Sequence, residues 1–107
     1  MVPIHPGRIL KRELAVRELS ANRLALLLRV PSGRICDILN GKRRVSAETA
    51  LRLARYFGTS AALWANLQAR YDLAVAEQAL GAKIVAEVPE AAASPWLLPS
   101  VHPISRP

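Results

Sequence analysis

The residues best suited to chemistry lie between positions 32 and 44. Residues 32–37, SGRICD, place Ser32, Arg34 and Asp37 within two turns of a helix, and residues 40–44, NGKRR, add three consecutive cations. An arginine can donate two hydrogen bonds to the edge of a guanine, and neighbouring cations neutralise phosphates and release condensed counterions. This pattern favours binding to a nucleic acid over a reaction on a small substrate.

Other chemistry finds little support in the sequence. Cys36 is the single cysteine, and His5 and His102 are too far apart in sequence to suggest metal-ligand spacing. There are no paired carboxylates, no Cys–His arrangement and no phosphate-cradling glycine loop. We therefore expect neither an enzyme nor a metal or other cofactor, and we interpret Cys36 as a small packing residue and His5 as a structural one.

The positive charge is concentrated in one half of the chain. The net charge is +7, and residues 1–58 hold twelve Lys/Arg against four Asp/Glu, whereas residues 59–107 hold three against four. A basic face of this kind points to a polyanionic partner. The first residues lack an uninterrupted apolar stretch and no apolar run could span a bilayer, so a cytoplasmic protein without membrane contact is expected.

Capping residues and apolar spacing predict five helices, and therefore an all-α fold. They are expected at 6–17, from the Ser20 cap to Leu28, from Pro31 to 40–41, from the Ser46 cap to Gly58, and from the Ser60 cap to about Ala79. The side chains expected to face inward are Ile9, Leu10, Leu14, Leu24, Ala25, Leu27, Leu28, Ile35, Ile38, Leu39, Ala50, Leu53, Ala54, Phe57, Leu63, Trp64, Leu67, Tyr71 and Ala74.

The last quarter of the chain has a different character. AKIVAEV, residues 82–88, is compatible with a short strand or with a continued helix, and residues 89–107 contain five prolines. We expect a helical DNA-binding domain at 1–80 and a C-terminal extension at 81–107 with a Pro-rich tail that is flexible or ordered by a partner. Its SPWLLPS segment is either dispensable or an apolar anchor for that partner.

We expect the third helix to be the recognition helix, which contacts the bases. Taking Ile35 as the buried direction, Gly33, Asp37 and Arg34 point outward or sideways, and Ser32 and Arg34 lie in the first turn, which normally meets base edges in the major groove. Ser20 and Asn22 begin the preceding helix, whose free amides can meet a phosphate. Because Gly33 offers no side-chain contact, we expect recognition to depend strongly on DNA shape and half-site spacing.

Residues 19–60, LSANRLALLLRVPSGRICDILNGKRRVSAETALRLARYFGTS, resemble the helix-turn-helix domain of the Cro/repressor (XRE) superfamily. HPGRILKREL before them and LWANLQARYDL after them look like the HigA (VapI-like) antitoxin branch. The resemblance covers about residues 5–73 and implies a lambda-repressor-like fold. It also implies a homodimer that represses its own operon by binding the operator and neutralises a HigB-like toxin that cleaves mRNA.

Carried over by position, the resemblance assigns two groups of DNA-facing residues. The base-facing group is Ser32, Gly33, Arg34 and Asp37, and the backbone-facing group is Ser20, Asn22, Asn40, Lys42, Arg43 and Arg44. The chain departs from the family at Arg8, Glu18 and Arg29, where Glu, Gly and Gly are usual. If the backbone at Arg29 needs a positive φ, arginine there costs about 1 kcal/mol relative to glycine.

Two alternatives stay open at this point. Asp37 could accept a hydrogen bond from a cytosine, or it could pair with Arg34 or Lys11 and limit unwanted phosphate binding. A stand-alone XRE-family regulator of phage or plasmid origin, without a toxin partner, would have the same fold and the same DNA-facing residues.

Overall fold

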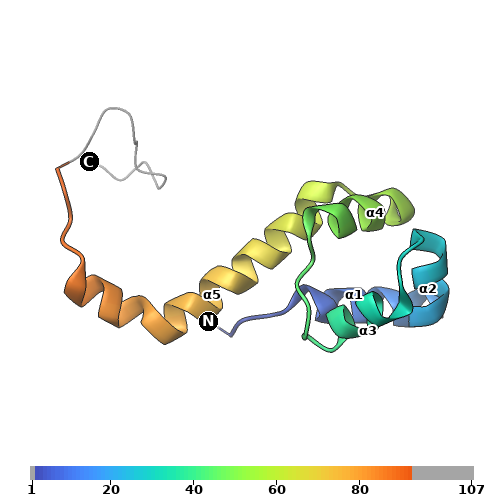
Figure 1. Ribbon diagram of the computed structural model, residues 1–107, viewed down its shortest axis with the longest axis horizontal. Coiled ribbons are helices and arrows are strands. Elements are labelled where there is room, and N and C mark those ends of the chain that lie inside the picture. Colours follow the sequence, from blue (N-terminus) through green and yellow to red (C-terminus); the bar gives the residue numbers. More distant parts are fainter. Residues whose placement is uncertain (1, 93–107) are drawn as a thin grey trace.

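The computed structural model describes residues 2–92, which form five helices and the loops between them (Figure 1). The helices are α1 (Pro6–Arg17), α2 (Ala21–Leu28), α3 (Ser32–Leu39), α4 (Ala47–Phe57) and α5 (Ala61–Glu87). The predicted all-α, five-helix fold is therefore confirmed. No helix of this described part of the chain is both long and apolar enough to cross a membrane.

The helices begin close to where capping residues predict. Three serines, Ser20, Ser46 and Ser60, each accept a hydrogen bond from the backbone N–H three residues later. Each bond satisfies a donor that the first helical turn leaves without a partner. The sequence predicts Pro31 at the first helical position of α3. In the structure Pro31 is one residue earlier, at the N-cap, where its ψ of 142° is extended.

Two helices end at residues in the left-handed conformation that are not glycine. Glu18 ends α1 with a φ of 52°, and Arg29 ends α2 with a φ of 59°. The conditional prediction about Arg29 thus applies, because the turn of the helix-turn-helix does require a positive φ there. Gly58 adopts the same conformation after α4, with a φ of 73°, without the steric cost that a Cβ brings.

One apolar core joins the helices. α3 packs on α1 and α2, while α4 packs on α5 and α2. The buried apolar side chains are Leu10, Leu14, Leu24, Ala25, Leu28, Ile35, Ile38, Val45, Ala50, Leu53, Ala54 and Trp64. Leu39, Phe57 and Leu67 are partly buried against this core, as members of the predicted inward faces.

Two predicted core positions are wrong. Leu27 is 42% exposed and Leu63 is 43% exposed. The buried arc of α2 runs from Leu24 through Leu28 to Ala25, and Leu27 lies about 60° outside it on the helical wheel. Leu63 likewise lies about 100° from Trp64, which is 2% exposed at the centre of the buried face of α5.

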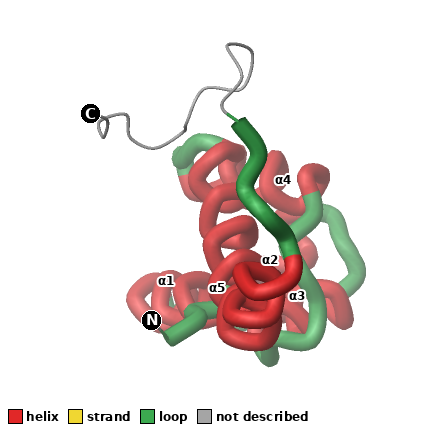
Figure 2. The backbone as a smooth tube through the Cα atoms, turned by 90° about the vertical axis from the view of Figure 1, so that its left-hand side faces the viewer, coloured by secondary structure: helices red, strands yellow, loops and turns green. Residues whose placement is uncertain are grey.

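Helix α5 runs well past the other four helices, as Figure 1 shows. In Figure 2, turned by 90°, this extended end of α5 points towards the viewer. The helix ends at Glu87, not near Ala79, and residues 82–87 therefore continue the helix instead of forming a strand. Alanine and other good helix formers outweigh the single interior Gly81, which costs only about 1 kcal/mol. The predicted boundary at residue 80 stays a prediction, and the predicted Pro-rich tail at 89–107 lies outside the described residues from 93 onward.

Candidate nucleic-acid interface

The first turn of α3 is open to a ligand. Ser32 and Gly33 are both exposed, and a Cβ added at Gly33 would meet no heavy atom within 4 Å beyond its chain neighbours and the backbone of its own helix. Gly33 is thus not required by packing, and any side chain could be accommodated there. The exposed first turn has the geometry of a helix that enters a groove with its N-terminal residues leading.

The other end of α3 is held tightly against α1. A Cβ added at Gly7 would overlap the carbonyl oxygen of Ile38, so only glycine permits this approach of the two backbones. Ile35 and Ile38 are fully buried on the same side of α3. This packing against α1 therefore determines how far the opposite, exposed face of α3 projects from the surface of the domain.

Arg34, predicted to face bases, points towards α4. Its Nη1 atom lies 3.7 Å from Oε1 of Glu48, and its side chain is 23% exposed. The separation exceeds a hydrogen-bond length, so the two groups form an ion pair in which the guanidinium keeps its donors available.

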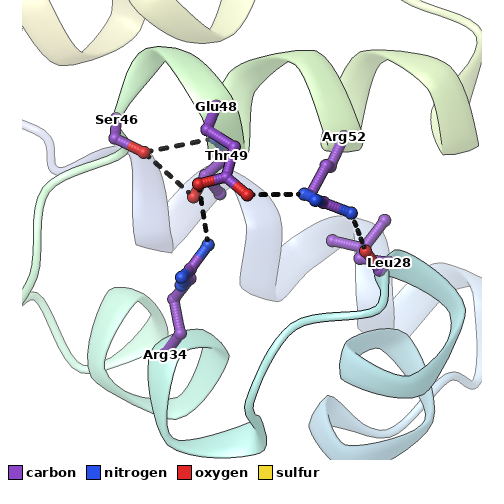
Figure 3. Close-up of polar contacts among 6 residues, drawn as sticks. All are labelled: Leu28, Arg34, Ser46, Glu48, Thr49 and Arg52. Atoms are coloured by element: carbon purple, nitrogen blue, oxygen red, sulfur yellow. Dashed lines mark hydrogen bonds and ion pairs between the residues drawn. The ribbon is translucent and has the colours of Figure 1, made fainter.

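Glu48 is itself held by a second arginine, as Figure 3 shows. Arg52 donates from Nε to Oε2 of Glu48 over 2.9 Å, and from Nη1 to the carbonyl oxygen of Leu28 over 2.9 Å. Since Leu28 is the last residue of α2, this chain of contacts links α2, α3 and α4 through their polar ends. The two helices of the helix-turn-helix are thereby both tied to α4.

The basic loop, residues 40–44, follows α3 in a defined conformation. Gly41 has a φ of 74°, its N–H donates to the Ile38 carbonyl over 3.0 Å, and the N–H of Lys42 donates to the Asp37 carbonyl over 2.8 Å. These two bonds form a Schellman motif, which satisfies the last carbonyls of the helix. The side chains of Lys42 and Arg43 are exposed and form no ion pair within residues 2–92.

Arg44 differs from its two neighbours in the basic loop. Its Nη1 atom lies 2.7 Å from Oδ2 of Asp72 on α5. Although burial raises the pKa of Asp72, the hydrogen bonds from Gln68 and Arg44 and the charges of Arg44 and His5 hold it below its usual value. Arg44 thus anchors the loop to α5 and would have to exchange Asp72 for a phosphate.

His5 contacts the same loop and α5. Its Nδ1 atom accepts a hydrogen bond from the N–H of Gly7 over 2.9 Å and so caps α1, while its ring meets that of Tyr71 edge-on at 4.9 Å. Burial lowers the pKa of His5, against the opposing effects of a hydrogen bond with the Arg43 backbone and the charge of Asp72. The predicted structural role of His5 is confirmed by these contacts.

The N-terminus of α2 presents the remaining predicted contacts. Ser20 and Asn22 are exposed. The Oγ atom of Ser20 accepts from the N–H of Arg23 over 3.0 Å, and its hydroxyl proton stays available to donate to a phosphate. The free amides of this first turn and its partial positive charge suit an anion.

Neither alternative for Asp37 is decided. Its side chain is half-buried, and within residues 2–92 it forms no ion pair with Arg34 or Lys11, both of which are described. The pairing alternative therefore lacks its predicted contact, and the cytosine contact stays a prediction. In the same part of the chain, no group of three or more His, Cys, Asp and Glu side chains could hold a metal ion.

Sequence reasoning missed four residues that position this surface: Glu48, Arg52, Gln68 and Asp72. The spacing of Glu48 and Arg52 does indicate a pair on one helix, as does that of Gln68 and Asp72. Nothing in the spacing indicates that these pairs reach Arg34 and Arg44 on other elements.

The fold and this surface define a helix-turn-helix protein, with a recognition helix followed by a basic loop. Residues 5–64 match the family model described as helix-turn-helix. The chain is 51% identical over 79 residues to virulence-associated protein I of Dichelobacter nodosus, covering 73% of each chain.

Two solved structures are similar over most of the chain. An addiction module antidote protein of the HigA family from Coxiella burnetii is 49% identical with a TM-score of 0.83, and the match covers 85% of this chain and all of that one. The Pseudomonas aeruginosa antitoxin HigA with the higBA promoter is 43% identical with a TM-score of 0.82 and the same coverage. The chain belongs to the helix-turn-helix family and, within it, to the HigA antitoxins.

Proposed function

We propose that this protein is a HigA-type antitoxin that binds the operator of its own operon as a homodimer, represses that operon and neutralises a HigB-like mRNA-cleaving toxin in the cytoplasm. The observation that carries the DNA-binding part is the exposed first turn of α3 together with the exposed cations of the basic loop that follows the same helix. Groups that read bases and groups that bind phosphates then lie at the two ends of one short helix.

The residues divide between two tasks in this proposal. Ser32, Arg34 and Asp37 contact base edges, and Gly33 lets the backbone of α3 approach the groove closely. Ser20, Asn22, Asn40, Lys42 and Arg43 contact the phosphate backbone, and Arg44 joins them if a phosphate replaces Asp72. The P. aeruginosa HigA structure with its promoter supports this function, because that relative shares 43% of its residues with this chain.

The distal part of α5 is the surface that we assign to the homodimer. Leu73, Leu80 and Ile84 are 70%, 47% and 49% exposed, and their positions lie within about 20° of one line along the helix. An exposed apolar stripe, flanked by Glu77, on a helix that extends past its own domain suits pairing with a second copy. Pairing would place two α3 helices at a fixed spacing on the operator. In this proposal the DNA-binding surface lies within residues 1–80, whereas the assembly surface spans the proposed boundary at residue 80, since Leu73 and Leu80 precede it and Ile84 follows it.

The DNA-binding proposal is tested by titrating the DNA upstream of the gene with the full-length protein in a gel-shift experiment at physiological salt. Saturable binding that survives excess random competitor is the expected result. Equal affinity for upstream and random DNA would reject operator binding.

The toxin part needs a separate experiment. The protein is co-expressed with the product of an adjacent small open reading frame, and growth and co-purification are measured. Rescue of growth together with a stable complex supports the antitoxin role. A protein that binds the operator but neither rescues growth nor co-purifies is instead a stand-alone regulator.

A further inference from the structure

Among the residues assigned to base contacts, only Arg34 carries an ion pair in the described structure. The pair with Glu48 is 3.7 Å long, and the Arg34 side chain is 23% exposed while that of Glu48 is 57% exposed. The guanidinium has five N–H donors, and one carboxylate oxygen at this distance engages none of them fully. The contact therefore restricts where the guanidinium points without consuming the donors that a guanine would need.

Glu48 can restrict Arg34 because Glu48 is itself oriented by a hydrogen bond. Its second oxygen accepts from Arg52 over 2.9 Å, and Arg52 is fixed in turn by its hydrogen bond to the Leu28 carbonyl at the end of α2 (Figure 3). Each carboxylate oxygen thus faces a different arginine. A carboxylate held on one side by a hydrogen-bonded guanidinium is a defined point of negative charge beside the first turn of α3.

The other acid–base pairs in the described residues differ from this one. Arg17 and Glu13 lie on α1 alone, with a 3.0 Å contact, and Lys83 and Glu87 lie on α5 alone. The Arg44–Asp72 pair does join two elements, the basic loop and α5, but its arginine is not assigned to base contacts. The Glu48 network instead joins the end of α2, the first turn of α3 and the first turn of α4. A free arginine side chain samples many rotamers. A counterion that restricts Arg34 before DNA binds therefore reduces the conformational entropy that this side chain loses on binding.

We propose that Glu48 is a specificity-determining positioning residue, which orients Arg34 for hydrogen bonding to a guanine and is itself held in place by Arg52. The inference rests on the proposed operator binding. In this proposal Glu48 influences which base is preferred without contacting a base itself. The proposal predicts that Glu48 affects which sequence is bound more than how tightly DNA in general is bound.

The test uses the full-length protein and a duplex that the wild type selects from a random DNA pool. Affinities for this duplex, for random DNA and for variants of the duplex with each base pair changed are measured at one salt concentration. Arg34→Ala should abolish the preference for a guanine at one position of each half-site, a loss on the order of tenfold in discrimination. Glu48→Gln should weaken the preference at that same position by roughly fivefold.

Two further variants separate positioning from other effects. Glu13→Gln removes the same charge from an ion pair on α1, and it should leave the discrimination ratio at the wild-type value. In the double variant Arg34→Ala with Glu48→Gln, the ratio should equal that of Arg34→Ala alone, because Glu48 acts through Arg34. Thermal unfolding of each variant identifies any that fails to fold, and Glu48→Asp replaces Glu48→Gln in that case, with a smaller loss of preference expected.

Three results would overturn the inference: an unchanged base preference in Glu48→Gln, a preference lost at a different position from that of Arg34→Ala, or additive losses in the double variant. Equal losses for selected and random DNA would mean that Glu48 only supports the fold. A wild type that selects no sequence from the pool would instead reject the proposed operator binding, so the two failures are distinguishable.

Discussion

The backbone N–H of Val45 donates a hydrogen bond of 2.8 Å to Oε1 of Gln68, and this bond joins the end of the basic loop to α5. Gln68 is 3% exposed, and its Nε2 atom donates to Oδ1 of Asp72 over 2.9 Å. The other carboxylate oxygen of Asp72, Oδ2, accepts a hydrogen bond from the Arg44 guanidinium. One buried amide thus fixes the position of a loop that is 23 residues distant in sequence.

Replacing Gln68 by Leu should lower the free energy of unfolding by about 1–3 kcal/mol. The buried N–H of Val45 loses its acceptor, and an unsatisfied buried donor costs about that much. Urea unfolding measures the change, with the exposed Asn66→Ala on the same helix as the control, expected within about 0.5 kcal/mol of the wild type. A Gln68→Leu protein as stable as the wild type would show that water replaces the lost acceptor.

Much of the fold could be predicted from the sequence because its signals are local. Serine caps at Ser20, Ser46 and Ser60 and apolar residues at helical spacing mark where helices begin and which faces are buried. The end of α5 could not be predicted in this way, because Gly81 is typical of a helix end although α5 continues through it, and the apolar pattern that follows allows helix or strand.

The contacts within the candidate site could be predicted less well from local sequence signals. Helical spacing places Arg34 beside the buried edge of α3, but its partner Glu48 is on another helix, 14 residues away. The contact between Arg44 and Asp72 depends on how α5 crosses the loop, which is a property of the tertiary structure. The positions of exposed cations were predictable as a group. It was not predictable that Arg44 is paired with Asp72 whereas Lys42 and Arg43 form no ion pair with any described residue.

Replacing Arg29 by Gly should raise the free energy of unfolding by about 1 kcal/mol. Arg29 has a φ of 59°, where its Cβ approaches the backbone closely, and glycine avoids that cost. Arg29→Ala is the matched control, because it removes the same charge and retains the Cβ. The gain should therefore appear in the glycine variant and not in the alanine variant when both are unfolded with urea.

Stability should decline as the pH falls below 6.5, and His5 should account for that decline. Burial lowers the pKa of His5 in the folded state below its ordinary value of 6.5, so the unfolded chain binds the proton first. The contribution of neutral His5 is complete above pH 6.5 and is lost as the pH falls through the folded-state pKa. Protonation of Nδ1 would also remove the acceptor that caps α1 at Gly7.

The measurement is the free energy of unfolding from pH 7.5 down to pH 5. Asp72 titrates below this range, since its pKa is held under 3.8, and it does not contribute to the slope. His5→Asn preserves a side-chain acceptor for capping but cannot titrate. A His5→Asn protein with the same pH dependence as the wild type would assign the effect to other groups.

Disrupting the apolar stripe of α5 should produce a monomer. In the variant Leu80→Glu with Ile84→Glu, two carboxylates per chain would face the second copy, and burying unpaired charge is strongly unfavourable. Sedimentation equilibrium should report the monomer mass, and operator affinity should fall because two half-sites are no longer bound together. Leu51→Glu, at a residue of α4 that is 63% exposed, should remain a dimer.

Removing the two exposed cations Lys42 and Arg43 of the basic loop should reduce the salt dependence of DNA binding. Each phosphate contact contributes about 0.9 to the slope of log affinity against log salt, so Lys42→Ala with Arg43→Ala should lower that slope by up to about two. Arg70→Ala with Lys83→Ala removes the same charge from α5 and should leave the slope unchanged. Because phosphate contacts carry no sequence information, both variants should keep the wild-type base preference. Loss of preference with an unchanged slope would instead show that Lys42 or Arg43 reads bases, and the assignment of the basic loop to the phosphate backbone would then be wrong.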